Sequence, residues 1–258
     1  MALNLRRRRR DPTATMTVVE HLEELRNRLI VSVAAVGLGM VGAWFLYQPV
    51  FNLLSDPYCD FMRAHPQLAF DPQDPCKLVF TSVVEPFLIK VKAVAFLGLV
   101  LALPVVLYQF WRFVTPGLTQ RERRYAVPFV VASLVLFALG GWFALVTLPR
   151  GLSFLLGFAG TTRVASVVTI GKYLGFVMLL ILAFGVAFEF PVVLVSLQLV
   201  GVLSTATLRR WRRYAWLLVA VLAAVITPSQ DWFTMVALML PLVVFYELSI
   251  LIGRAFKR

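Results

Sequence analysis

The stretch YLGFVMLLILAFGVAFEFPVVLVSLQLV at residues 173–200 decides the fold, because Glu189 is the one charged residue in its whole length. A helix needs about 20 apolar residues to cross the hydrocarbon core of a bilayer, and this stretch exceeds that length. The rest of the chain has the same character. Of its 258 residues 60 % are apolar and 15 % are charged, whereas a soluble domain carries about 25 % charge. We therefore predict an all-α polytopic membrane protein.

Working outward from this stretch, the apolar runs predict six transmembrane helices. Their ranges are 29–47, 91–114, 125–148, 173–200, 214–227 and 232–252. The fifth would span about 21 Å of a hydrocarbon core about 30 Å thick. We expect helices five and six to be short and to thin the bilayer locally. A further apolar run at 152–170 contains Arg163 and several glycines, and we interpret it as part of an external loop.

The basic residues predict the orientation, because Lys and Arg accumulate on the cytoplasmic side of membrane proteins. Most of the 25 basic residues fall in the segment 1–28, in the connections 115–124 and 201–213, or in the tail 253–258. Both termini are therefore expected in the cytoplasm, with external loops at 48–90, 149–172 and 228–231. The net charge of +12 would suggest nucleic acid in a soluble protein. Between apolar segments it indicates loops facing anionic lipid, which the five arginines at 6–10 would also bind.

The segment 1–28 divides into a basic tail and an amphipathic helix that includes HLEELRNRL at 21–29. Its leucines share one face at i, i+3 and i+7, and its glutamates lie on the other. A solvated polar face explains this pattern. The alternative is recognition, because Glu24 and Glu122 would both lie at the cytoplasmic surface. Two guanidinium groups would suit such a pair of carboxylates.

Glu189 is the one acid predicted at mid-membrane. An ionised carboxylate at a helix centre costs about 2.5–3.5 kcal/mol on insertion scales. The side chain must therefore face protein or a wet cavity, or be protonated. A satisfied structural hydrogen bond is one explanation, and a functional acid is the other.

No motif in the sequence predicts catalysis. There is no glycine-rich phosphate loop and no nucleophile elbow, and His21 and His65 would lie on opposite sides of the membrane. We therefore expect no enzyme, no cofactor and no metal site. Cys59 and Cys76 share the first external loop, where a disulfide and two free thiols both remain open. Metal binding by the pair is disfavoured, since no CxxC spacing supports it.

Five motifs, taken in order, resemble the TatC family, the receptor subunit of the twin-arginine translocase. They are HLEELRNRL at 21–29, EPF at 85–87, FVTPGL at 113–118 with ERR at 122–124, FGVAFEFP at 184–191, and ITP at 226–228. The resemblance covers about residues 17–252. The chain departs from it at 227–231, where TPSQD replaces the usual Thr-Pro-Pro-Asp, and at Met235, where the family frequently has glutamine.

The resemblance implies a receptor for folded precursors whose signal peptides carry consecutive arginines. It implies no catalysis, single-span partners of the TatA and TatB type, a homo-oligomer within the complex, and export driven by the proton-motive force. The residues implied to contact the signal peptide are His21, Glu24, Arg26, Phe113 and Glu122. Glu189 matches the family's intramembrane acid. Positions implied to be structural or to contact partners are Pro49, Glu85, Pro86, Thr227 and Asp231.

The membrane implied is the bacterial plasma membrane, with a thylakoid less favoured because no transit-peptide pattern is visible. The rival class is a proton-coupled secondary transporter with Glu189 as the proton carrier. Such folds usually contain internal repeats, and none is visible between the two halves of the chain. A structural membrane scaffold is the third interpretation.

Overall fold

The computed structural model describes residues 18–66, 69–71, 73–114, 126–157, 168–228 and 231–255. These residues form helices and a single isolated parallel β-bridge between Val79 and Thr169. The helices are α1 (Val18–Ala64), α2 (Glu85–Val114), α3 (Ala126–Gly157), α4 (Ile170–Phe188), α5 (Phe190–Leu199), α6 (Thr205–Arg210), α7 (Arg212–Ile226) and α8 (Trp232–Ala255). The all-α class is therefore confirmed.

Five segments of the described chain are long and apolar enough to cross a membrane. They are Val19–Ala64, Glu85–Phe113, Val127–Leu155, Ile170–Leu199 and Trp232–Ala255. Helix α7 has 15 residues, or about 22 Å, so the fifth predicted helix is short as expected. The same expectation for the sixth is wrong, because α8 has 24 residues and spans about 36 Å. It continues through Gly253, where any side chain would collide with Gln198 of α5.

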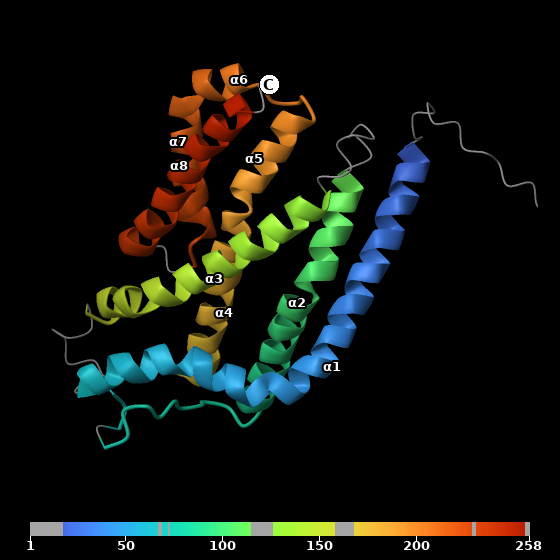
Figure 1. The fold of residues 1–258 in the computed structure, drawn as a ribbon. Coiled ribbons are helices and arrows are strands. Elements are labelled where there is room, and N and C mark those ends of the chain that lie inside the picture. The colour runs from blue at the N-terminus through green and yellow to red at the C-terminus, as the bar shows by residue number, and fades with distance from the viewer. Residues whose placement is uncertain are drawn as a thin grey trace, which may run out of the picture.

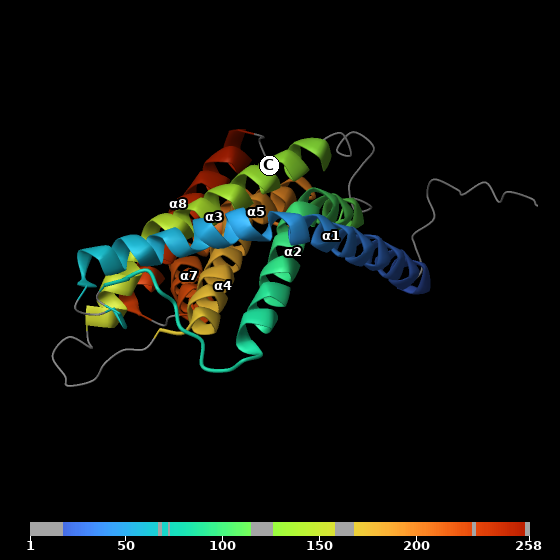
Figure 2. The same ribbon diagram turned by 90° about the horizontal axis from the view of Figure 1, so that it is seen from below.

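Helix α1 joins three segments that were predicted to be separate. The predicted surface helix, the predicted helix at 29–47 and the first part of the predicted loop at 48–90 form one helix of 47 residues. Pro49 and Pro57 lie inside it, and each removes a backbone hydrogen bond. Figures 1 and 2 show α1 bending between its first and last parts instead of ending. The expected boundary at residue 48 is therefore wrong.

Tertiary packing explains why α1 continues past its prolines. Leu54 and Tyr58 of its last part are buried, with only 3 % and 2 % of their surface exposed. The hydroxyl of Tyr173, in the first turn of α4, donates a hydrogen bond to the Leu54 carbonyl oxygen at 2.9 Å. The rings of Tyr58 and Tyr173 lie 5.1 Å apart between centroids. The predicted loop 149–172 is shorter for a similar reason, because α3 continues to Gly157 and Leu152 is buried.

The apolar stretch 173–200 forms one membrane-length segment in two parts. Helix α4 ends at Phe188, α5 begins at Phe190, and Glu189 lies between them with φ −70° and ψ −15°. Pro191 is in the first turn of α5, so it cannot donate the backbone hydrogen bond that a continuous helix would require. The acid and the interruption of the helix therefore occur at the same point.

Glycines let the helices approach closely at two crossings. A side chain at Gly39 of α1 would collide with the backbone of Gly98 in α2. At the second crossing, Gly140 of α3 meets the backbone of Phe184 in α4, and Gly185 meets the ring of Phe137. Close backbone contact through small residues is how membrane helices gain packing energy in lipid. The start of α1, the end of α2 and the end of α8 lie at the same end of the molecule (Figure 1).

Candidate functional site

The first turns of α1 lie against the last turns of α2 and bring two predicted recognition residues together. The rings of His21 and Phe113 stack with centroids 4.5 Å apart and an angle of 20° between planes. Arg28 extends the contact, since its Nη1 donates to the backbone oxygen of Gln109 at 3.4 Å. The side of 21–29 that carries His21 and Arg28 is thus docked on α2, whereas the leucines at 22, 25 and 29 are 43–60 % exposed.

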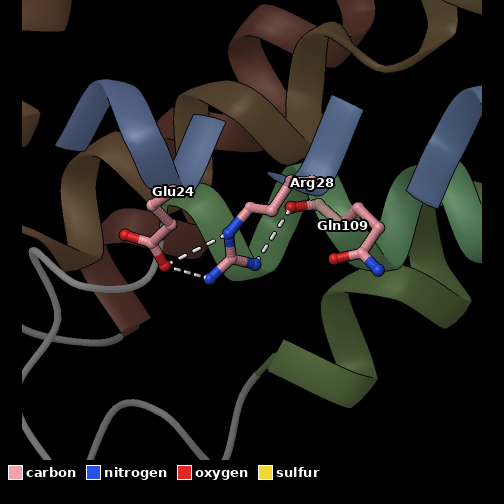
Figure 3. A network of polar contacts seen from close by, with 3 residues as sticks. All are labelled: Glu24, Arg28 and Gln109. Atoms are coloured by element: carbon pink, nitrogen blue, oxygen red, sulfur yellow. Dashed lines mark hydrogen bonds and ion pairs between the residues drawn. The ribbon is translucent and has the colours of Figure 1, made fainter. Parts of the chain in front are cut away.

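Glu24 and Arg28 form a half-buried ion pair one helical turn apart (Figure 3). The Arg28 Nε donates to the Glu24 Oε1 at 3.2 Å, and Nη2 contacts the same oxygen. The two side chains are 22 % and 14 % exposed. Oε2 of Glu24 is buried and has no hydrogen-bond partner among the described residues. A buried acceptor without a partner costs about 1–3 kcal/mol, so this oxygen is a strong site for an incoming donor.

The other predicted contacts differ in their surroundings. Arg26 pairs with Glu23 at 3.9 Å, and both side chains are more than 60 % exposed. Such a pair contributes little to stability. Glu122 lies outside the described residues, so its proximity to Glu24 stays a prediction.

A second polar site lies inside the bundle around Glu189. The hydroxyl of Ser133, in α3, is hydrogen-bonded to the Glu189 side chain. Trp111, in α2, donates its indole N–H to the Ser133 oxygen at 2.9 Å. Oε1 of Glu189 is buried and lacks a hydrogen-bond partner within the ranges that the structure describes. Neither Trp111 nor Ser133 was predicted as a site residue, although a serine within a strongly apolar helix could have indicated a partner for the acid.

Glu85 belongs to a different kind of site at the opposite end of α2. Its Oε2 accepts hydrogen bonds from the Thr81 backbone N–H at 2.8 Å and the Thr81 hydroxyl at 3.1 Å. Its Oε1 accepts one from the Gly171 N–H at 3.0 Å. The neighbouring Ile170 N–H donates to the Val79 oxygen at 2.9 Å. Glu85 therefore fastens the segment before α2 to the first turn of α4, and we refer to these contacts as the Glu85 clasp.

The remaining predicted positions have local structural surroundings. Pro86 lies in the first turn of α2, where a missing N–H costs nothing, and Pro49 lies inside α1. Asp231 accepts from the Thr234 N–H at 2.8 Å and so caps α8. Thr227 follows α7, is buried, and donates its hydroxyl to the Ala223 oxygen.

Two further contacts link residues outside these sites. Cys59 and Cys76 are joined by a disulfide, with their Cα atoms 4.6 Å apart. Glu247 of α8, which the sequence analysis did not single out, pairs with Arg212 at 2.5 Å. Nowhere in the described chain do three or more His, Cys, Asp or Glu residues gather as a metal site would require.

Comparison with known proteins places this geometry in a family. The model of the Sec-independent protein translocase protein TatC matches residues 20–241. A TatC of Frankia casuarinae is 44 % identical over 257 residues, which cover 98 % of this chain and 69 % of the relative. A TatC of Aquifex aeolicus is 38 % identical over 245 residues, with 94 % and 97 % coverage.

The fold agrees with the sequence. A crystal structure of the twin-arginine translocase receptor TatC superposes with a TM-score of 0.73 at 37 % identity, covering 93 % of this chain and all of that one. Such proteins are components of a protein translocase and not a catalytic family, in agreement with the expectation that the chain is not an enzyme. The chain therefore belongs to the TatC family of Sec-independent protein translocase proteins.

Proposed function

We propose that this chain is the receptor of a twin-arginine translocase and binds the paired arginines of signal peptides at the α1–α2 end. The observation that carries the proposal is the state of Glu24. One of its oxygens is held by Arg28, while the other is buried and has no partner in the described chain. An arginine guanidinium donates charge-assisted hydrogen bonds to a carboxylate in fixed planar geometry. The stacked rings of His21 and Phe113 lie at the same helix ends and would border the peptide.

The topology that we propose has six spans, with α7 as the fifth, and both termini in the cytoplasm. Basic residues at the start of helix α7 suit a cytoplasmic end, and the turn before α8, which Asp231 caps, suits an external end. Its length of about 22 Å requires a thinned bilayer or shielding by neighbouring helices. With this orientation, Glu24 faces the compartment from which precursors arrive, and the arginines at 6–10 contact anionic lipid.

The mechanism that we propose is binding followed by insertion. Glu24 and Glu122 capture the two guanidinium groups, and the apolar part of the signal then enters the bundle near Glu189. Occupancy repositions single-span partners of the TatA and TatB type, which assemble the passage under the proton-motive force. The setting is a bacterial plasma membrane, and several copies of the chain act together in the complex.

A binding experiment with a matched control tests this proposal. The full chain in lipid nanodiscs is titrated with a fluorescent signal peptide that carries two arginines, and with the same peptide carrying two lysines. The Glu24→Gln substitution keeps the shape but removes the charge. It is expected to weaken binding about 10- to 150-fold, which corresponds to about 1.5–3 kcal/mol for hydrogen bonds to a charged group.

Glu23→Gln is the control, because Glu23 is the neighbouring acid and its side chain is 63 % exposed. It should leave the affinity unchanged. Equal affinity of the wild type and the Glu24→Gln variant for the arginine peptide would disprove the proposal. So would equal affinity of the wild type for the arginine and lysine peptides, because an ammonium group cannot form the planar two-bond contact.

A further inference from the structure

Trp111 is a buried tryptophan whose polar atom is used between helices. Membrane tryptophans are enriched at the lipid–water interface, where the indole N–H meets water. Trp111 is instead only 2 % exposed, and its ring stacks on Phe129 with centroids 5.1 Å apart. Its N–H donates to Ser133, whose side chain is completely buried. The sequence therefore places a strong donor where lipid or protein offers few acceptors.

The donor and acceptor capacities fix the direction of the hydrogen bonds. An indole nitrogen only donates, so the Ser133 oxygen must be the acceptor in the contact with Trp111. A serine hydroxyl has one hydrogen, which is then available for the Glu189 carboxyl. These hydrogen bonds run from Trp111 to Ser133 to Glu189 and connect α2, α3 and the α4–α5 junction. Without the indole, the serine hydroxyl could rotate toward its own helix backbone.

Helix geometry connects this series of hydrogen bonds to the α1–α2 end. Successive residues of a helix are separated by about 100°. The Phe113 ring stacks on His21, and the backbone oxygen of Gln109, four residues earlier, accepts the hydrogen bond from Arg28. Trp111 lies about 200° from Phe113, so it points to the opposite side of the same turn. One turn of α2 thus contacts Arg28 and His21 on one side and, through Trp111, contacts Ser133 on the other.

We propose that Trp111 and Ser133 are positioning residues, which hold the Glu189 carboxyl and transmit to it the occupancy of the α1–α2 end. This inference rests on the proposed receptor function. A signal peptide that displaces the Phe113 ring or the Arg28 contact shifts the last turn of α2. Trp111 moves with that turn, and the hydrogen bond from Ser133 to Glu189 is lengthened or released. Glu189 would then be prepared for the apolar part of the signal before that part reaches it.

Infrared difference spectroscopy on the full chain in nanodiscs tests the inference. The infrared bands of the Glu189 carboxyl are assigned as those that are absent from the spectrum of the Glu189→Gln variant. Before any peptide is added, Ser133→Ala should shift these bands, and Trp111→Phe should shift them less and in the same direction. Addition of the two-arginine signal peptide should change the Glu189 bands of the wild type. This change should be lost in Ser133→Ala and in Trp111→Phe when each variant is measured at a peptide concentration that saturates it.

The controls separate positioning from general packing. Ser153→Ala removes an exposed serine hydroxyl of α3, and Trp142→Phe alters an exposed tryptophan of the same helix. Both should leave the Glu189 bands unchanged, and Ser133→Thr should restore the response because it keeps a hydroxyl. Unchanged Glu189 bands in Ser133→Ala would overturn the positioning role. A full peptide response in Ser133→Ala would overturn the coupling. Absence of peptide binding to the wild type would overturn the receptor proposal and the coupling. The positioning role would still be tested separately, by comparing the Glu189 bands of the wild type and Ser133→Ala before peptide is added.

Discussion

The carboxylates near the two ends of α2, Glu85 of α2 itself and Glu24 of α1, differ in how many hydrogen bonds they accept. In the Glu85 clasp, both carboxylate oxygens accept hydrogen bonds from Thr81 or Gly171. At the other end, Glu24 has one oxygen on Arg28 and one without a partner in the described ranges. Buried polar groups are nearly always satisfied in folded proteins. A satisfied carboxylate therefore indicates a structural role, and an incompletely satisfied one indicates a place for a ligand.

The connections around the two carboxylates differ in the same way. The Cys59–Cys76 disulfide and the Val79–Thr169 bridge fix the region of the Glu85 clasp. The α1–α2 end is held by a ring stack and by the hydrogen bond from Arg28 to the Gln109 oxygen, and neither is covalent. The proposed receptor function requires this division, since the proposed binding end must rearrange while the helix bundle keeps its register.

The largest predicted effect concerns the disulfide. Cys59→Ser with Cys76→Ser opens a link across a separation of 17 residues. In the chain-entropy model this destabilises the protein by about 3 kcal/mol. The thermal midpoint followed by tryptophan fluorescence in nanodiscs should fall, and affinity for the two-arginine peptide should stay the same. A loss of peptide affinity would show that the two ends of α2 are not independent.

The next effect concerns Arg28, which holds one oxygen of Glu24. Arg28→Met keeps an apolar stem but leaves the carboxylate without its internal partner. We expect the free energy of unfolding to fall by about 1.5–3 kcal/mol, the contribution of a hydrogen bond to a charged group. Denaturation by SDS in mixed micelles measures this change. Peptide affinity should not fall, because both Glu24 oxygens become available to the incoming guanidinium. A variant that loses affinity as well as stability would make Arg28 part of the binding surface.

How far the sequence predicts these features depends on the range of the contacts. The Glu24–Arg28 pair follows from the spacing of four residues, and the apolar stretches follow from composition. The contacts of Trp111 with Ser133 and of Ser133 with Glu189 link helices far apart in sequence, where no periodicity indicates partners. The continuation of α1 through Pro49 likewise depends on Tyr173, more than a hundred residues away. Local patterns thus indicated the residues of the α1–α2 end, while the contacts inside the bundle required the structure.

A smaller effect is expected at Asp231, which caps α8 through the Thr234 N–H. Asp231→Ala removes the cap and should cost about 0.5–2 kcal/mol of stability, while Asp231→Asn retains an acceptor and should cost less. The SDS titration distinguishes the two variants. Equal losses would mean that the charge of Asp231, and not its capping oxygen, is what α8 requires.

The smallest effect is predicted for the exposed pair of Glu23 and Arg26. Their charged atoms lie 3.9 Å apart, and the side chains are 63 % and 68 % exposed, so the pair should contribute about 0.2–1 kcal/mol or less. Glu23→Gln should therefore barely change the SDS titration at any salt concentration. Arg26→Gln distinguishes a role in this ion pair from direct contact with the signal peptide, because loss of the pair alone would leave peptide affinity unchanged. If Arg26→Gln weakens peptide binding while Glu23→Gln does not, Arg26 contacts the signal peptide directly, and the binding end extends along the exposed face of α1.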